Sequence, residues 1–373
     1  MADAKDGVQS INVGIIGMGR SGWELHAAWL SKDPAFRLVA VCDQSPTRRA
    51  EAARTFSARP YQDASDLIAD PAVQLVVVAS PSNLHATLAI AALEAGKHVV
   101  VEKPMAITLA EADDMAAVAV RCGRVLTVFH NRRWDRDYQM VKKLVADGML
   151  GKLLTLDSRV MTYGPEWTTY GVPEFNPQWR IQKAWGGGFL ADWGPHMVYQ
   201  ALELVGYWPS DTVHSGAPKG TTGLSITCQL RSQLWATEVE DYFNVRLAFA
   251  SGLVATLEGT NNARIPLPRW FVVGSEGTLT ADGAWGRWTE MRLRRTMSGM
   301  PVDVLPQGVG PSSGGRNYDV GEELSALFYQ DLAEALTTGR PPAITAKQAR
   351  DVMAVLDAAR RSDATGQTVN LSF

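Results

Sequence analysis

Residues 11 to 130 alternate short apolar runs with amphipathic stretches, and this alternation most limits the folds open to the chain. The apolar runs are rich in β-branched residues and lack polar alternation, as strands buried on both faces do. They are Ile11–Ile16, Leu38–Cys42, Leu75–Ala79, His98–Val101 and Val125–Phe129. Helical segments follow them, the first two at about Trp23–Ser31 and Thr47–Phe56. Strands that alternate with helices form a doubly wound parallel sheet, so we expect an α/β domain over residues 1–130.

A different pattern begins after Asn131. The chain has 373 residues, more than one hydrophobic core usually serves, so a second domain is expected over residues 131–373. Its longer runs alternate apolar and polar side chains, which predicts a mostly antiparallel sheet with one face in water. These runs are Leu153–Tyr163, Glu238–Ala250, Leu253–Gly259 and Trp270–Val273. Three helices complete an α+β domain, with an exposed loop at Pro306–Asn317; the helices are Arg133–Ala146, about Val320–Thr337 and about Thr345–Arg361.

Composition narrows the range of partners. A net charge of -3 offers no broad attraction for nucleic acid or an anionic membrane. The first ten residues carry no apolar stretch of signal-peptide length, and the densest apolar run is too short to span a bilayer. Three widely separated cysteines, Cys42, Cys122 and Cys228, predict neither a disulfide framework nor a metal site. A soluble cytoplasmic protein without metal is the expectation.

The segment Gly17-Met18-Gly19-Arg20-Ser21-Gly22 has the spacing G-x-G-x-x-G directly after the first strand. The first glycine permits a tight turn, the second lets the backbone approach a pyrophosphate, and the third lets helix and strand pack closely. The following helix start offers N–H groups to phosphates. A structural glycine turn is the alternative, but Asp43 at the end of the second strand adds the expected acidic residue. The pattern predicts a dinucleotide-binding Rossmann domain in which Met18, Arg20 and Ser21 line the turn.

The acidic residue also bears on which dinucleotide is bound. A carboxylate at Asp43 accepts hydrogen bonds from ribose hydroxyls and repels a 2′-phosphate, which favours NAD over NADP. Arg48 and Arg49 follow closely, and an arginine there can accommodate that phosphate. The alternative places both arginines on the solvated face of a helix. We expect NAD.

Two polar segments follow later strands of the predicted sheet. Ser80-Pro81-Ser82-Asn83-Leu84-His85 comes after the third apolar run, and Glu102-Lys103-Pro104 comes after the fourth. Ligands of open α/β sheets bind at these carboxyl ends of strands. Taken alone, Lys103 would be a surface charge and His85 an ordinary helix-start residue.

The ordered set of motifs resembles the glucose–fructose oxidoreductase, inositol dehydrogenase and rhizopine-catabolism family (Gfo/Idh/MocA). The set comprises the glycine turn, Ser80-Pro81-x-Asn83-x-His85, Glu102-Lys103-Pro104 and Asp192-x-Gly194-x-His196. Gly274-Ser275-Glu276-Gly277-Thr278-Leu279 and Gly339-Arg340-Pro341-Pro342 extend the resemblance over nearly the whole chain. It implies a Rossmann domain followed by a domain whose open, largely antiparallel sheet carries the substrate site. It also implies a homodimer or homotetramer joined through that sheet.

The resemblance assigns roles to matching positions. Lys103 would lie near the nicotinamide and the reacting hydroxyl, His196 would accept the proton, and Asp192 would bond to substrate or to His196. Histidine suits proton transfer near neutral pH because its ordinary pKa is about 6.5. Lysine as a cation stabilises an alkoxide, whereas a desolvated neutral lysine can be the base, so the base is either His196 or Lys103. Because Pro195 lacks an N–H, we expect the helix to begin near Asp192, with that carboxylate as a possible N-cap.

Local motifs are most similar to the branch containing NADP-linked scyllo-inositol dehydrogenase. His130-Asn131-Arg132-Arg133-Trp134-Asp135 is one such motif, and Arg132 is a candidate for the nicotinamide end of the cofactor. Tyr199 departs from the family, which often has aspartate three residues after the histidine. Six of the twelve tryptophans fall between Trp134 and Trp208, and aromatic faces suit sugar-like ligands as well as protein cores. The candidate substrate-site residues besides Lys103, Asp192 and His196 are Trp134, Trp167, Tyr170, Trp179, Arg180 and Trp185.

The sequence thus predicts an oxidoreductase that transfers a hydride between nicotinamide and a hydroxyl or keto carbon of a sugar, cyclitol or sugar derivative. Two alternatives share the fold. One is a redox-neutral glycoside hydrolase that oxidises a ring hydroxyl, eliminates the aglycone and returns the hydride to NAD. The other is a sugar-sensing regulator without chemistry, against which the presence of both Lys103 and His196 argues.

Overall fold

The computed structural model describes residues 10–165, 176, 178–208, 223–283, 290–297, 300–304 and 317–372. Within these ranges the chain forms two compact units. The first contains the described residues up to Phe129, Asn176 and residues 317–350. The second contains the other described residues from His130 to Val304, and residues 351–372. Residues 317–350 thus lie with the first unit, although they follow most of the second unit in sequence.

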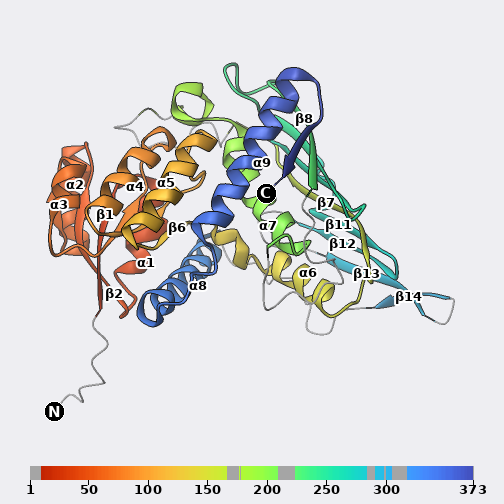
Figure 1. The fold of residues 1–373 in the computed structure, drawn as a ribbon, viewed down its shortest axis with the longest axis horizontal. Helices are drawn as coiled ribbons and strands as arrows, with labels where there is room; N and C mark the ends of the chain where they lie inside the picture. Colours follow the sequence, from red (N-terminus) through yellow and green to blue (C-terminus); the bar gives the residue numbers. More distant parts are fainter. Residues whose placement is uncertain are drawn as a thin grey trace, which may run out of the picture. The chain divides into compact units, whose positions relative to one another are not determined.

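Six parallel strands of the described chain form the sheet of the first unit, in the order β3-β2-β1-β4-β5-β6 (Figure 1). Valine-rich β4 and β5 are almost wholly buried, as expected for strands covered on both faces. The strands are β1 Ile11–Ile16, β2 Phe36–Cys42, β3 Arg59–Tyr61, β4 Leu75–Val78, β5 His98–Val101 and β6 Leu126–Val128. This order is that of a Rossmann fold, and the predicted α/β class is confirmed.

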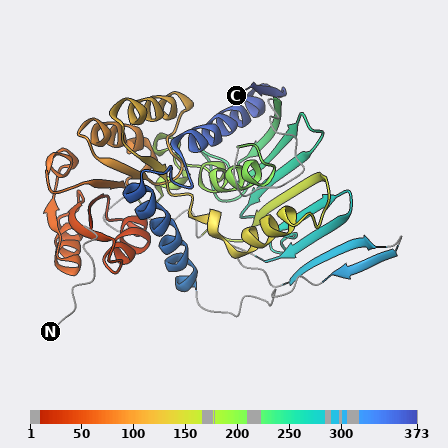
Figure 2. The same cartoon turned by 60° about the horizontal axis from the view of Figure 1, so that its bottom comes forward.

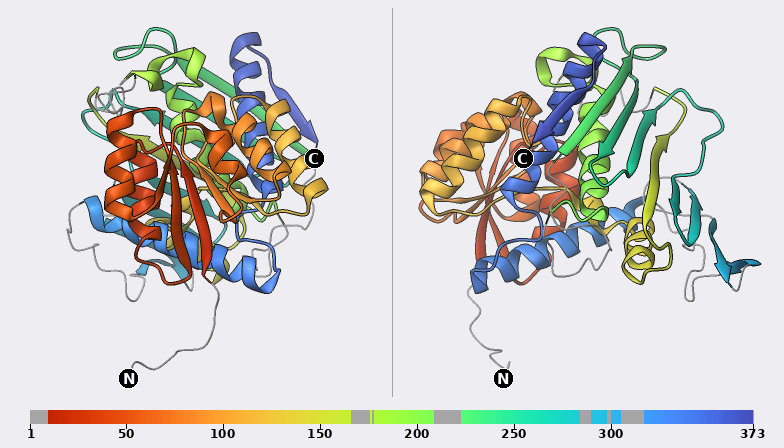
Figure 3. Two further views of the ribbon diagram at one scale, coloured as in Figure 1. Left: turned by 90° about the vertical axis from the view of Figure 1, so that its left-hand side faces the viewer. Right: turned by 45° about the vertical axis from the view of Figure 1, so that its right-hand side comes forward.

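Helices flank this sheet (Figure 3, left). The helical segments of the first unit are η1 Ser21–Ala27, α1 Ala28–Leu30, α2 Pro46–Phe56, α3 Ala64–Ala69, η2 Ser82–Leu84, α4 His85–Glu94, α5 Leu109–Cys122 and α8 Asn317–Thr338. The first helix begins at Ser21 with wide π-type turns, two residues earlier than expected. Thr108 and Glu111 form a reciprocal capping box at the start of α5, which explains why that helix begins where it does.

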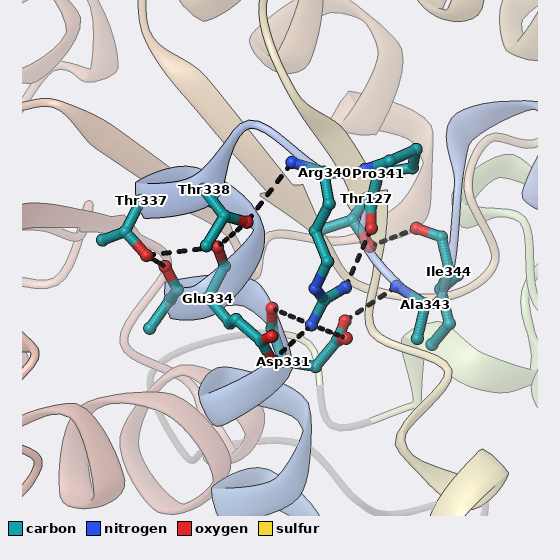
Figure 4. Close-up of polar contacts among 10 residues, drawn as sticks. Thr127, Asp331, Glu334, Thr337, Thr338, Arg340, Pro341, Ala343 and Ile344 are labelled. Atoms are coloured by element: carbon teal, nitrogen blue, oxygen red, sulfur yellow. Dashed lines mark hydrogen bonds and ion pairs between the residues drawn. The ribbon is translucent and has the colours of Figure 1, made fainter.

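The loop after α8 is fixed to the first unit by polar contacts (Figure 4). The Arg340 guanidinium donates to Asp331 Oδ1 at 2.7 Å, and Asp331 Oδ2 accepts the Ala343 N–H at 2.8 Å. Thr127 in β6 donates its hydroxyl to the Ile344 carbonyl at 2.8 Å. These bonds tie the chain between α8 and the start of α9 to the sheet, although more than 200 residues separate Thr127 from Ile344.

Nine strands of the described chain form the second sheet, in the order β14-β13-β12-β11-β7-β10-β9-β8-β15. Only β7 and β10 pair in parallel, so the predicted mostly antiparallel sheet is confirmed. The strands are β7 Leu153–Met161, β8 Gly223–Arg231, β9 Tyr242–Phe249, β10 Val254–Thr260, β11 Trp270–Gly274, β12 Gly277–Asp282, β13 Glu290–Met297, β14 Met300–Val304 and β15 Val369–Ser372. The hairpin of β13 and β14 forms one edge (Figure 2).

The helical segments of the second unit are η3 Asn131–Trp134, α6 Arg136–Ala146, η5 Trp179–Ile181, η6 Lys183–Trp185, α7 Phe189–Leu204 and most of α9 Ala346–Thr365. Buried α7 packs on β7, β9 and β10 (Figure 3, right). Phe271 in β11 is exposed, and strand alternation places it on the sheet face opposite its buried neighbours Trp270 and Val272. The expected helix Arg133–Ala146 is interrupted, because Asp135 has an extended ψ of 130° between η3 and α6. No helix among the described residues is long and apolar enough to cross a membrane.

The expected strand Glu238–Ala250 is too long at its start: β9 begins at Tyr242. The residues before Tyr242 form hydrogen bonds outside the sheet. The Asp241 carboxylate accepts three backbone N–H groups of the preceding loop at 2.7–2.8 Å, from Gln233, Leu234 and Trp235. A residue that closes a loop in this way does not extend the strand ladder.

Candidate active site

The glycine turn between β1 and η1 has the shape its sequence requires. Gly17 has a φ of +94°, and a Cβ there would lie 2.6 Å from the Ala79 carbonyl oxygen, so only glycine fits. A Cβ at Gly22 would overlap the Gly17 carbonyl. At Gly19, by contrast, no described atom lies within 4 Å of a Cβ position. The turn is therefore closed at its ends and open in the middle, where a pyrophosphate would approach.

Asp43, just past the end of β2, holds the turn by its carboxylate. Oδ2 accepts the Met18 N–H at 2.7 Å, and Oδ1 accepts the Ser45 N–H at 2.8 Å. Arg48 donates to the Met18 carbonyl at 2.7 Å, and Arg49 donates to the Asp43 carbonyl at 2.6 Å. Both arginines, whose alternative placement was a solvated helix face, thus contact the backbone around the turn.

His85 joins the two polar segments that follow β4 and β5. Its Nε2 lies 3.0 Å from the Ser80 carbonyl oxygen, and its Nδ1 lies 2.8 Å from that of Pro104. The ring is fully buried, and this burial lowers the pKa of His85. In the segment after β4, the buried Asn83 Oδ1 has no hydrogen-bond partner among the described residues. His85 therefore fixes both segments at the sheet edge, while Asn83 keeps an acceptor for a ligand.

Glu102 precedes Lys103 and is buried, whereas Lys103 is partly exposed. Glu102 Oε2 accepts the Lys103 N–H at 3.1 Å, and Oε1 lies 3.2 Å from His26 Nε2. Burial acts to raise the pKa of Glu102, but the hydrogen bond and charge interaction with His26, together with Lys103, lower it below its ordinary value. Sequence reasoning missed His26, because a histidine in a helix after a glycine turn carries no motif of its own.

The helix α7 carries Asp192 and His196 one turn apart, on one face. The expectation that α7 begins near Asp192 is wrong: it begins at Phe189, and Asp192 donates its N–H to the Gly188 carbonyl at 3.0 Å. Pro195 consequently lies in the second turn, where it gives no N–H to the carbonyl of Ala191.

Glu240 explains the earlier start of α7. Its backbone carbonyl accepts the Phe189 N–H at 3.0 Å, and its Oε1 accepts the Leu190 N–H at 2.9 Å. These bonds satisfy two of the N–H groups at the helix start that have no acceptor within the helix. No local pattern could predict them, because the cap comes from 50 residues further along the chain.

His196 lies in an aromatic environment on the second unit. Its ring centroid is 5.8 Å from that of His130 and 6.2 Å from that of Trp193. Tyr199, the departure from the family pattern, stacks on His130 at 5.2 Å and an angle of 24°. Tyr199 therefore packs against the ring that neighbours His196.

Arg132 lies beside this cluster. Its guanidinium carbon is 4.6 Å from the Trp193 ring centre, and its Nη1 lies 3.1 Å from Asp135 Oδ2. Burial raises the pKa of Asp135 to about 6 even though Arg132 acts to lower it. A stacked, ion-paired arginine presents a fixed cation next to the face that carries His196.

The other substrate-site candidates come from three short helical segments of the second unit, η3, η5 and η6. Trp134 in η3 lies under the Arg133 guanidinium, at 5.6 Å. Arg180 stacks on Trp179 in η5 at 4.5 Å, so these two act together. Trp185 ends η6 and is partly buried. Trp167 and Tyr170 lie outside the described residues.

Known proteins share this arrangement over the whole chain. Residues 11–130 match the oxidoreductase family with NAD-binding Rossmann fold, and residues 138–280 match the Gfo/Idh/MocA C-terminal domain. The chain belongs to the Gfo/Idh/MocA oxidoreductase family. The first domain is therefore the NAD-binding Rossmann domain of this family, and the second is its C-terminal domain.

Individual members of the Gfo/Idh/MocA family are similar along their full length. Myo-inositol 2-dehydrogenase of Thermotoga maritima is 36% identical over 365 residues, covering 97% of this chain and 98% of that one. The NADP(+) scyllo-inositol 2-dehydrogenase of Bacillus subtilis is 29% identical, covering 98% and 97%. An NAD-binding protein of Listeria innocua has a solved structure with a TM-score of 0.78, at 27% identity and 97% coverage of both chains.

The first unit fits the dinucleotide that the Gfo/Idh/MocA family binds. The open position at Gly19 gives room for the pyrophosphate, and the N–H groups at the start of η1 face that turn. Asp43 lies at the end of the neighbouring strand, where a ribose would be held. Asn83 Oδ1 supplies a buried acceptor that the described residues leave unused. The chemistry of these groups suits a dinucleotide.

Proposed function

We propose that this protein is an NAD-linked dehydrogenase that acts on a hydroxyl or keto carbon of a sugar, cyclitol or sugar derivative. The observation that carries the proposal lies in the first unit. Lys103 follows β5 at the same sheet edge as the glycine turn after β1 and Asn83 after β4. An ammonium group at the carboxyl edge of a Rossmann sheet is placed for chemistry next to a bound cofactor. The named inositol dehydrogenases among its relatives support the substrate class.

Each proposed residue has a distinct role in the reaction. A bound nicotinamide accepts or supplies the hydride. His196 takes the hydroxyl proton during oxidation, a task that suits an imidazole near neutral pH. Lys103 stabilises the developing alkoxide as a cation. Asp192, one turn before His196 on α7, orients the substrate or the imidazole.

The cofactor preference rests on Asp43. Its carboxylate is fixed by the Met18 and Ser45 N–H groups and retains lone pairs for two vicinal ribose hydroxyls. A 2′-phosphate at the same place would meet that negative charge. We propose NAD as the cofactor, Arg132 as a contact at its nicotinamide end, and Ser80, Pro81 and Glu102 as backbone or positioning contacts around it.

The test combines substrates with two variants. Wild-type protein, Lys103→Ala and Lys152→Ala are incubated with NAD and a panel of sugars, inositols and aryl glycosides, and NADH absorbance and aglycone release are followed separately. The proposal expects stoichiometric NADH from at least one polyol. Lys103→Ala should lose most turnover but still bind NADH, whereas Lys152, an exposed lysine, should be dispensable.

Other outcomes of this test decide against the proposal. Aglycone release without net NADH would establish the redox-neutral hydrolase instead. Substrate binding without any turnover would indicate the sensor. Wild-type turnover in Lys103→Ala would remove Lys103 from the chemistry.

A further inference from the structure

A chain of three buried polar side chains leads from α8 to the residue before Lys103. Tyr329 in α8 places its hydroxyl 2.7 Å from His26 Nδ1. His26 Nε2 lies 3.2 Å from Glu102 Oε1. The other carboxylate oxygen of Glu102 accepts the Lys103 N–H at 3.1 Å. All of these residues belong to the first unit.

The Glu102 carboxylate fixes the direction of two of these hydrogen bonds. Because a carboxylate only accepts, His26 Nε2 carries a hydrogen and donates it to Oε1, while Oε2 accepts the Lys103 N–H. Burial and the nearby charge of Glu102 raise the pKa of Tyr329 well above its ordinary value, so the phenol keeps its proton.

Aromatic side chains keep water away from these bonds. His26 and Tyr329 are fully buried, and the Phe129 ring lies 4.5 Å from His26. Phe36 and Phe328 contact the Tyr329 ring at 5.4 and 5.2 Å. Hydrogen bonds in such a low-dielectric setting are stronger and more directional than bonds at the surface. The three residues are thus held as one rigid unit.

The network connects the glycine turn after β1 with the segment that follows β5. His26 lies in η1, the segment that begins at the glycine turn, and Glu102 directly precedes Lys103. We infer that the Tyr329–His26–Glu102 network positions Lys103 relative to the glycine turn, with Tyr329 as a remote positioning residue. This inference rests on the proposed function only for its kinetic consequence.

Loss of the Tyr329 hydroxyl should loosen the network stepwise. In Tyr329→Phe, His26 Nδ1 loses the hydroxyl that holds it, and the imidazole is free to rotate away from Glu102. The carboxylate then holds the Lys103 N–H less firmly, and the lysine side chain that starts there is less well placed. Misplacement of a reacting group lowers turnover more than it lowers binding.

The experiment uses the full-length protein with three single variants, Tyr329→Phe, Glu102→Gln and Thr127→Val. The double variant combines Tyr329→Phe with Glu102→Gln. Tyr329→Phe removes one buried hydroxyl, and Glu102→Gln keeps the shape of the side chain but removes its charge. Thr127→Val is the matched control, because it also removes a buried hydroxyl hydrogen bond of the first unit, to Ile344, without touching Glu102. Far-ultraviolet circular dichroism and the urea midpoint confirm that each variant has folded.

Amide hydrogen exchange of the unliganded protein gives a readout that needs no activity. Exchange at the Lys103 amide should become at least roughly five-fold faster in Tyr329→Phe and in Glu102→Gln, and remain as in wild type in Thr127→Val. Unchanged exchange at Lys103 in Tyr329→Phe would overturn the inference. This arm stands even if no substrate of the proposed class is turned over.

Kinetics give the second readout once a substrate is found. Tyr329→Phe should lower kcat by roughly ten-fold with KM for substrate and cofactor changed less than about two-fold. The double variant should be no slower than the slower single variant, because both changes break one network. Multiplicative losses in the double variant, or an equal loss in Thr127→Val, would show that Tyr329 acts through general stability and not through Glu102.

Discussion

At the scale of single residues, Asp43 combines two tasks that its sequence position does not reveal. It fixes the glycine turn through Met18, and it stands where the ribose is expected. Arg48 binds the same turn from the other side, through the Met18 carbonyl. A carboxylate and a guanidinium therefore meet at one turn. We propose that the balance of these two charges sets the choice between NAD and NADP.

Substitution of Asp43 tests this balance. Asp43→Ser should weaken NADH binding by roughly ten-fold or more, because a charge-assisted acceptor for the ribose is lost. NADPH binding should weaken less or improve, because Arg48 then meets a 2′-phosphate without an opposing carboxylate. Fluorescence titration with both nucleotides measures the ratio. Asp33→Asn is the control. Asp33 accepts the Ala35 N–H in the turn before β2, at the sheet edge opposite the glycine turn, so its substitution should leave the ratio unchanged.

Asp135 provides a pH-dependent contribution to stability. Its pKa is raised from 3.8 to about 6 by burial, so the folded state binds a proton that the unfolded state has already released between these values. The group therefore costs stability above about pH 6, and the cost disappears as the pH falls towards about 4. A shift of this size corresponds to at most about 3 kcal/mol.

Urea denaturation between pH 4.5 and 7.5 measures that cost. The free energy of unfolding of wild type, relative to Asp135→Asn, should fall as the pH rises through about 6. Asp147→Asn removes an exposed carboxylate that pairs with Lys143 and should track wild type throughout. A parallel pH dependence of wild type and Asp135→Asn would contradict the assigned ionisation.

At the scale of elements, α7 depends on a residue that precedes β9. The helix is buried at every residue except the partly exposed Asp192, and it carries both Asp192 and His196. Its position along its own axis is set by where it begins, and Glu240 fixes that start through two hydrogen bonds. Burial raises the pKa of Glu240, although the N–H groups that its carboxylate accepts act to lower it.

Two substitutions at Glu240 separate hydrogen bonding from charge. Glu240→Ala should lower the free energy of unfolding by about 1–2 kcal/mol, the usual cost of losing a helix N-cap. Glu240→Gln keeps an oxygen for the Leu190 N–H and should cost less than about 0.5 kcal/mol. Urea denaturation of both variants, with Glu238→Ala as a nearby control, gives the values. Equal losses in Glu240→Ala and Glu240→Gln would show that charge, and not the cap, matters.

At the scale of the whole molecule, the open face of the second sheet is the surface to explain. Phe271 is 38% exposed in β11, and its neighbours on that face include Val273 and Val254 among charged residues. Apolar side chains set among polar ones are typical of protein–protein interfaces. A second copy of this chain is the proposed cover, which would give a homodimer or homotetramer.

A charge at Phe271 tests this assembly. Phe271→Glu should shift the protein to a lower oligomeric state, because two like charges would be buried in a face that contacts its own copy. Sedimentation velocity measures the change. Leu234→Glu changes an exposed leucine of the loop between β8 and β9, away from this face, and should leave the assembly as in wild type. An unchanged oligomer in Phe271→Glu would place the interface elsewhere.

Short-range patterns allowed much of the first unit to be predicted from the sequence. Buried β-branched runs predict β1, β2, β4, β5 and β6, because each strand meets helices on both faces wherever it lies in the sheet. The glycine turn is likewise local: Gly17 needs its positive φ and Gly22 its lack of Cβ whatever surrounds them. The sequence by itself determined these elements and the place of Asp43.

Only the tertiary structure decided which distant residues meet. Tyr329 reaches His26 across 303 residues, and Glu240 reaches α7 across 50. The same is true of α8, which joins the first unit although it lies in sequence between β14 and β15 of the second sheet. Side chains in such contacts obey no fixed spacing, because their partners are chosen by how the elements pack. The physical reason is that helix and strand periodicities are properties of neighbouring residues, whereas caps and buried hydrogen-bond networks are properties of the folded chain.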